Sequence, residues 1–88
     1  MISIIIPVLN EASTISTLLN DIAEKASLQN ISEIIMVDGG STDATFDLAF
    51  QFSEKLPLVI LKSDKGRAKQ MNLGAGNATG EILYFLHA

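Results

Sequence analysis

Short apolar runs alternate with segments of helical spacing along this chain. The runs occupy residues 2–9, 34–37, 58–61 and 82–86 and are rich in isoleucine, leucine and valine. Each run is too short for a typical helix and almost continuously apolar, which predicts strands that are buried on both faces. Pro7 has no amide hydrogen and is tolerated best near a strand end, so we expect the first strand to leave the sheet at residues 8–11.

The segments between the runs predict three helices. In the first segment apolar residues recur at three- and four-residue steps, which is typical of an amphipathic helix. We expect these residues to face the core: Ala12, Ile15, Leu19, Ile22, Ala23 and Ala26. After the tight turn at residues 39–40, Ser41 or Thr42 is expected to cap the second helix, with Asp43 in its first turn. The buried face of that helix is then Phe46, Ala49 and Phe50.

The third predicted helix runs from about residue 66 to residue 78. Its apolar positions at helical spacing are Ala68, Met71, Ala75 and Ala78. Gly74 and Gly76 each lower intrinsic helix stability by about 1 kcal/mol relative to alanine, so we expect them to allow close packing against the sheet or a ligand.

The predicted order of elements is strand-helix-strand-helix-strand-helix-strand. Parallel strands joined by right-handed helical crossovers accommodate this order most simply. We therefore predict an α/β fold with a four-stranded parallel sheet and helices on both faces. Connectivity alone does not set the strand order, but if the first strand is central the order is 3-2-1-4. In that order a ligand site is expected between the first and fourth strands, at their carboxyl ends.

Composition narrows the class of protein. A length of 88 residues with 48% hydrophobic residues predicts a single domain over residues 1–88, and the absence of cysteine excludes disulfides and thiolate metal sites. No signal-peptide pattern and no apolar stretch of about 20 residues occurs, so we expect a cytoplasmic protein without a membrane span. A net charge of −4 argues against nucleic-acid binding.

Positive charge is concentrated in one part of this acidic chain. Residues 62–69 carry four of the six lysines and arginines, with only Asp64 opposing them. Such a run is either the solvated start of a helix or a site for an anion.

Three loops are predicted to meet at the carboxyl edge of the sheet: residues 7–11, 38–43 and 63–67. They supply carboxylates, hydroxyls, small residues and cations. A carboxylate such as Asp38 accepts hydrogen bonds from a base or a ribose, whereas lysine and arginine favour phosphate, so the combination suits a nucleotide. Two simpler interpretations stay open: Asp38 bonds its own turn, and Ser41 and Asp43 only cap a helix.

Familiar nucleotide and hydrolase motifs are absent from the sequence. There is no G-x-G-x-x-G after the first strand, no G-x-x-x-x-G-K-[ST] and no G-x-S-x-G. The single histidine, His87, is at a predicted strand end, where a packing or surface role competes with catalysis or metal binding.

Four segments resemble the amino-terminal half of the nucleotide-sugar-binding region of family-two inverting glycosyltransferases, which have the A-type glycosyltransferase fold. They are residues 3–11 (SIIIPVLNE), 34–43 (IIMVDGGSTD), 66–74 (GRAKQMNLG) and 78–88 (ATGEILYFLHA). The resemblance covers essentially the whole chain. The third segment and the ending FLHA look most like the subgroup associated with arsenosugar biosynthesis.

The resemblance implies a Rossmann-like, truncated nucleotide-diphospho-sugar-binding domain. It places the binding residues at Pro7, Val8, Leu9, Asn10, Glu11, Asp38, Gly39, Ser41, Asp43, Lys65, Gly66 and Arg67. Glu11 is expected near the base or ribose and Asp38 at a uracil-type base, and Arg67, with Lys65 as a weaker candidate, beside the base or diphosphate.

The family also has an Asp-x-Asp-like motif that binds Mn²⁺ or Mg²⁺ after the fourth strand, and a later carboxylate that acts as general base. We expect both beyond Ala88. The chain alone is therefore expected to bind a UDP-sugar weakly, to hold no metal tightly and to have no catalytic residue of its own.

Two alternatives remain. The first is a noncatalytic α/β module that self-associates, giving a dimer or another homo-oligomer, because an uncovered fourth strand presents an unpaired edge. The second is a flavodoxin-like or receiver-like domain, which the loop at Asp38 does not exclude by itself.

Overall fold

The protein has the predicted alternation of strands and helices in a computed structural model that describes residues 1–25 and 30–87. The strands are β1 (Ile2–Val8), β2 (Ile31–Asp38), β3 (Leu58–Lys62) and β4 (Ile82–Phe85), and the helices are α1 (Ile15–Lys25), α2 (Thr45–Phe50) and α3 (Arg67–Asn77). Ala26, predicted to face the core, and Ala88, the last residue of the fourth matching segment, lie outside the described residues.

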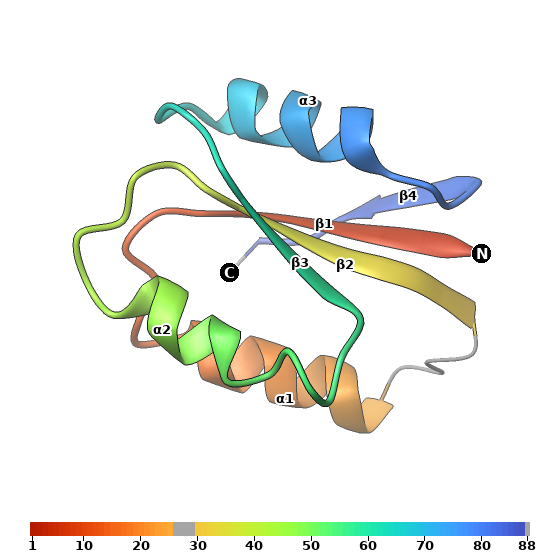
Figure 1. Cartoon of the computed structure of the whole chain (residues 1–88), viewed down its shortest axis with the longest axis horizontal. Helices are drawn as coiled ribbons and strands as arrows, with labels where there is room; N and C mark the ends of the chain where they lie inside the picture. Colours follow the sequence, from red (N-terminus) through yellow and green to blue (C-terminus); the bar gives the residue numbers. More distant parts are fainter. Residues whose placement is uncertain (26–29, 88) are drawn as a thin grey trace.

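The sheet confirms the predicted topology. All strand pairs are parallel and the order is β3-β2-β1-β4. Figure 1 shows α1 and α2 on one face of the sheet and α3 on the other. β1 lies between β2 and β4, so the strand order reverses its direction at β1. Open α/β sheets bind ligands at such a point, beyond the carboxyl ends of the strands.

The central strands carry the core on both faces. Ile4, Ile6 and Met36 pack with α1 and α2 in the larger cluster, and Ile5 and Val37 pack under α3 in the smaller one. Helix α3 approaches closely because Gly74 has no side chain: a Cβ at this position would be 2.6 Å from Ile5 Cγ2. The predicted close packing is thus confirmed for Gly74. It is wrong for Gly76, where a Cβ would meet nothing within 4 Å.

The fourth strand is not the buried strand that its composition predicts. All residues of β4 are exposed, with exposed fractions from 39% at Leu83 to 58% at Ile82. The physical reason is that β4 is an edge strand paired only with β1, while α3 packs over β1 and β2. Apolar composition alone did not distinguish this edge from a centre strand.

The predicted cap of the second helix is wrong, and its predicted buried face is correct only in part, since Ala49 is buried but Phe50 is exposed. Neither Ser41 nor Thr42 caps α2, whose N-cap position is Ala44 without a side-chain hydrogen bond. Phe50 is 59% exposed and stacks on Phe46, with ring centroids 6.1 Å apart, while Thr45 and Ala49 supply the buried positions. The helix has six residues, too few for the extended stripe that we predicted.

The stripe predicted for α3 differs by about one position. Its buried residues are Gln70 and Gly74, and Ala68 is exposed. Ala75 and Ala78 do pack partly against the smaller cluster. A polar residue occupies the core-facing position near the start of the helix because its amide is hydrogen-bonded there, as described below.

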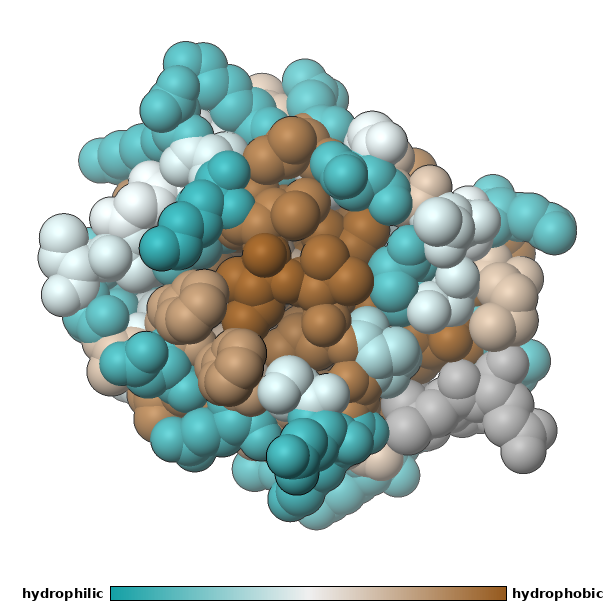
Figure 2. Space-filling view, in the orientation of Figure 1, coloured by the Kyte–Doolittle hydropathy of each residue, from teal (hydrophilic) through white to brown (hydrophobic). Residues whose placement is uncertain are grey.

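The other edge of the sheet is apolar as well. Figure 2, viewed from the side on which β3 lies in front of the sheet in Figure 1, shows hydrophobic side chains gathered in the middle of this face. In β3, Val59 is 42% exposed and the apolar residues on either side of it are partly buried. Both outer strands of the sheet thus present apolar surface to solvent.

Candidate functional site

A small cleft opens where the loops after β1 and β3 meet. Its volume is about 210 Å³, and its lining residues are Pro7, Val8, Leu9, Lys65, Gly66, Arg67 and Gln70. The side from β1 is apolar and partly buried, whereas Lys65 and Arg67 are exposed cations on the side that leads into α3. The cleft therefore combines an apolar wall with positive charge, and six of the predicted site residues line it.

The loops after β1 and β2 are tied together by polar contacts. The backbone N–H of Asn10 donates to Ser41 Oγ at 2.9 Å, and Asn10 Oδ1 accepts from the backbone N–H of Thr42 at 2.8 Å. Asn10 adopts a positive φ of 54°, a conformation that asparagine tolerates better than most residues. These predicted residues therefore link two loops and do not line the cleft.

Asp38 ends β2 and is almost buried, with 3% of its surface exposed. Its Oδ1 accepts hydrogen bonds from the backbone N–H groups of Gly40 at 2.9 Å and Ser41 at 2.7 Å. The simpler interpretation of Asp38 as a residue that organises its own turn is thus confirmed. Among residues 1–25 and 30–87, no hydrogen bond reaches its second carboxylate oxygen.

Asp43 joins the start of α2 to the loop after β1. Its Oδ1 accepts from the hydroxyl and the backbone N–H of Thr45, and its Oδ2 accepts from the backbone N–H of Ala12. The hydrogen bond from the Thr45 hydroxyl, with these backbone donors, holds the pKa of Asp43 below its usual value. Thr45 Oγ1 in turn accepts from the backbone N–H of Glu11 at 2.8 Å.

The carboxylate of Glu11 makes a local contact. Its Oε2 accepts from the Thr14 hydroxyl at 3.2 Å, and its backbone carbonyl accepts from the N–H groups of Thr14 and Ile15. Glu11 thus belongs to the turn that precedes α1 and is not among the residues that line the cleft. Glu11 therefore lies beside the candidate site.

Gln70 is a cleft residue that the sequence analysis missed. It is 4% exposed, and its side-chain Nε2 donates to the backbone carbonyls of Val8 and Val37, both at 2.8 Å. A Cβ on Gly39 would lie 2.9 Å from the Gln70 amide, so the loop after β2 packs directly on this side chain. One feature of the sequence could have indicated this role: a glutamine, not an apolar residue, occupies a position on the helix between Arg67 and Gly74.

The end of the described chain returns to the cleft. Arg67 Nη1 lies 3.2 Å from Nε2 of His87 and also contacts Nδ1 of the same ring. An imidazole nitrogen without a proton is the acceptor in such a contact. His87 is exposed, which agrees with the surface role that the sequence left open for it.

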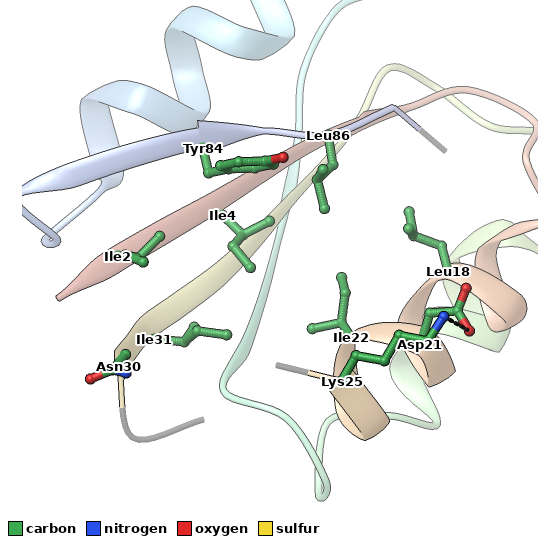
Figure 3. Close-up of a pocket in the computed structure, with 10 residues that line it drawn as sticks. All are labelled: Ile2, Ile4, Leu18, Asp21, Ile22, Lys25, Asn30, Ile31, Tyr84 and Leu86. Atoms are coloured by element: carbon green, nitrogen blue, oxygen red, sulfur yellow. Dashed lines mark ion pairs between the residues drawn. The ribbon is translucent and has the colours of Figure 1, made fainter. Parts of the chain in front are cut away.

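A larger, apolar groove lies elsewhere on the molecule. It has a volume of about 650 Å³ and lies between α1 and strands β1 and β4, lined by Ile2, Ile4, Leu18, Asp21, Ile22, Lys25, Asn30, Ile31, Tyr84 and Leu86 (Figure 3). The Asp21–Lys25 ion pair lies along one side. None of the predicted site residues borders this groove, so we assign the candidate site to the smaller cleft because of its polar groups, not its size.

The described residues do not form a metal centre. Within the described ranges, no three histidine, cysteine, aspartate or glutamate side chains cluster so that they could hold a metal ion. We therefore derive no chemical step through a metal in this chain. None of the described helices is both long and apolar enough to cross a bilayer.

The sequence matches a known family over most of its length. The family described as Glycosyl transferase family 2 matches residues 3–88. The chain is 43% identical over 91 residues to a PGL/p-HBAD biosynthesis glycosyltransferase of Mycobacterium bovis, a match that covers 100% of this chain and 35% of that protein. This chain thus spans about a third of the length of such a relative.

Solved structures share the fold of this chain, which again covers only part of each of those proteins. The TarS 1–349 structure from Staphylococcus aureus, in complex with UDP-GlcNAc, superposes with a TM-score of 0.90 and 29% identity, over 98% of this chain and 26% of that one. The mannosyltransferase PcManGT of Pyrobaculum calidifontis, in complex with GDP-Man and Mn²⁺, gives a TM-score of 0.80 and 31% identity, over 93% and 25%. The four-stranded unit therefore recurs inside larger proteins.

Proposed function

Because the chain belongs to glycosyl transferase family 2, we propose that it is the donor-binding part of an enzyme that transfers a sugar from a nucleotide-diphospho sugar to an acceptor hydroxyl with inversion. The assignment to the arsenosugar-associated subgroup stays a prediction. The observation that carries the proposal is the cleft of Pro7, Val8, Leu9, Lys65, Gly66 and Arg67, with Asp38 in the adjoining turn.

The chemistry of the cleft fits the parts of a nucleotide. Its apolar wall suits the face of a base, and the exposed Lys65 and Arg67 suit a diphosphate, which favours lysine and arginine. Oδ1 of Asp38 is used by its turn, so Oδ2 is the oxygen proposed to accept a hydrogen bond from the imide or amide of the base.

The size of the cleft supports weak binding by this chain. Ligand sites usually have volumes of about 300–1,000 Å³, and the cleft is smaller than this range at about 210 Å³. A nucleotide-diphospho sugar bound here would extend beyond the cleft. The rest of the donor site is proposed to come from other parts of a longer protein, as in relatives of about three times this length.

The chain alone is proposed to lack transfer activity. Inverting transfer requires a general base at the acceptor hydroxyl and stabilisation of the departing diphosphate. Of these, the cleft offers positive charge from Lys65 and Arg67 for the diphosphate. Neither Glu11, which is bonded to Thr14, nor Asp38, which is bonded to its turn, is proposed to serve as the base.

UDP and GDP both serve as test ligands, because one matching structure is in complex with UDP-GlcNAc and the other with GDP-Man. Saturation-transfer NMR of the chain with UDP, GDP and uridine as separate probes should show UDP or GDP bound more tightly than uridine, since only the diphosphates meet Lys65 and Arg67. Equal signals for uridine and UDP would contradict the role of the cations. Release of UDP from UDP-GlcNAc above the buffer rate would contradict the proposed inactivity.

The exposed fourth strand supports a second candidate function, self-association of a noncatalytic module. Edge strands with unpaired backbone groups pair readily with another chain, and in β4 all residues are exposed and apolar or aromatic. The proposed occupant is a second copy of the same edge. Light scattering of the chain at increasing concentration decides this: a rising mass supports it, and a constant monomer mass contradicts it.

A further inference from the structure

The amide of Gln70 bonds to the ends of β1 and β2 and to the loop after β3. Its Nε2 donates to the carbonyl of Val8, from which the first loop starts, and to that of Val37, which precedes Asp38. Its Oε1 accepts from the backbone N–H of Gly66 at 3.4 Å. One buried side chain therefore connects the apolar wall, the strand that leads into the turn of Asp38, and Gly66 at the end of the loop that carries Lys65.

The surroundings of this amide leave it little freedom. Gln70 is 4% exposed, and the loop at Gly39 lies so close to it that even a methyl group on Gly39 would collide. The Val8 carbonyl also accepts from the Gly39 N–H at 3.0 Å, so the two strand ends are joined both directly and through Gln70. A buried amide with several partners is fixed in orientation, because any other position leaves polar groups unpaired.

We propose that Gln70 is a positioning residue that sets the spacing between the Asp38 turn and the loop of Lys65 and Arg67, so that both contact one nucleotide. The inference rests on the proposed function and deepens it. Gln70 carries no charge, and both hydrogens of its Nε2 are used by the carbonyls of Val8 and Val37. Its contribution to affinity then acts through Asp38 and the cations.

Two variants separate positioning from general stability. Gln70→Met keeps the length of the side chain and removes its donors, and Gln70→Asn keeps the amide but is too short to reach both carbonyls. Asn77→Ala is the matched control, because Asn77 is an exposed amide on the same helix and its side chain, among the described residues, bonds only the Leu73 carbonyl. If Gln70→Met does not fold, Gln70→Asn and the ligand-free measurement below still decide the question.

The ligand-free measurement is amide hydrogen exchange. In both variants the amides of Gly39 and Gly66 should exchange roughly tenfold faster than in the parent chain, while those of Thr79 and Gly80, at the opposite end of the sheet, should keep their rates. The control variant should change neither pair. An equal acceleration at both ends would mean that Gln70 only stabilises the fold, and would overturn the proposal.

The ligand measurement is a double-mutant cycle with UDP as the probe. Gln70→Asn should weaken UDP binding about tenfold in the parent chain and have little further effect in an Asp38→Asn background, because coupled residues are not additive. Additive losses would overturn the positioning role. Absence of UDP binding to the parent chain would instead contradict the proposed function, and the exchange rates would then decide the role of Gln70 by themselves.

Discussion

The side-chain oxygen of Asn10 accepts a hydrogen bond from the backbone N–H of Thr42 at 2.8 Å, and this contact joins the loop after β1 to the loop after β2. The backbone N–H of Asn10 adds a second link to Ser41 Oγ. Residues about thirty positions apart in the sequence are thereby held side by side. The walls of the candidate site are fixed by such contacts between loops as well as by the sheet.

Replacement of Asn10 tests the strength of this link. Asn10→Ala removes the acceptor and puts at a φ of 54° a residue that tolerates this conformation less well than asparagine, so the free energy of unfolding should fall by about 1–3 kcal/mol. Asn10→Gly loses the same acceptor but tolerates the positive φ, and should lose less. Urea unfolding of the three proteins measures the difference, and an alanine variant as stable as the parent would contradict the account.

Two glycines of α3 should respond to alanine in opposite directions. Gly74→Ala places a Cβ 2.6 Å from Ile5 Cγ2 and 3.2 Å from Val37 Cγ2, and should destabilise the fold by about 1–3 kcal/mol through overpacking. Gly76→Ala meets open space and should gain up to about 1 kcal/mol from helix propensity. The midpoints of thermal unfolding should therefore move apart. A stabilised Gly74→Ala would show that α3 can shift away from the sheet.

Stability should depend on pH through Glu33, which lies at the opposite end of the sheet from the cleft. Burial by itself raises the pKa of Glu33, but hydrogen bonds from the hydroxyls of Ser3, Thr79 and Ser32 and from the Thr79 backbone N–H together hold it below the ordinary value of 4.5. The stabilisation is then fully present above pH 4.5 and is lost as the pH falls through the lower pKa of the folded state.

Urea unfolding at a series of pH values between about 6 and 3 measures this dependence. Glu33→Gln is the control, because it has a similar shape and does not titrate. The parent should lose stability over the acid range more steeply than the variant. Identical slopes would mean that Glu33 has the same pKa in the folded and unfolded chains.

Asp38 should be separable into a turn residue and a ligand residue. Asp38→Asn keeps an oxygen for the N–H groups of Gly40 and Ser41, so the fold should be only slightly less stable, whereas Asp38→Ala leaves both donors unpaired and should cost about 1–3 kcal/mol. Removal of the charge should still weaken UDP binding roughly tenfold in the asparagine variant. Unchanged affinity in Asp38→Asn would leave Asp38 as a turn residue alone.

The sequence predicted the alternation of parallel strands and helices, because this depends on the spacing of apolar residues and on the handedness of the crossover connections. The parallel sheet and the convergence of three loops at its carboxyl edge follow from these rules, whereas the order 3-2-1-4 also required the assumption that the first strand is central. Burial was less predictable. The apolar composition of β4 is that of a centre strand, but its place at the edge leaves it exposed, and composition does not report which neighbours a strand has.

The residues of the candidate site were likewise predictable only in part. Pro7, Leu9 and Arg67, three of the predicted binding residues, line the cleft, because their positions at the ends of elements determine where they lie. Gln70 was missed because a glutamine within a helix is usually exposed, and only the three-dimensional structure brings the carbonyls of Val8 and Val37 within its reach. The roles of Ser41 and Asp43 in joining loops were likewise not visible from helix-capping rules.

A titration of the isotopically labelled chain with UDP shows whether these loops form a nucleotide site. The account predicts that, at millimolar UDP, the amide signals of Leu9, Gly39, Gly40, Gly66 and Arg67 shift together along one binding curve, while those of Thr79 and Gly80 remain in place. No shift at the first group, or shifts confined to residues of the apolar groove such as Ile22 and Tyr84, would contradict it.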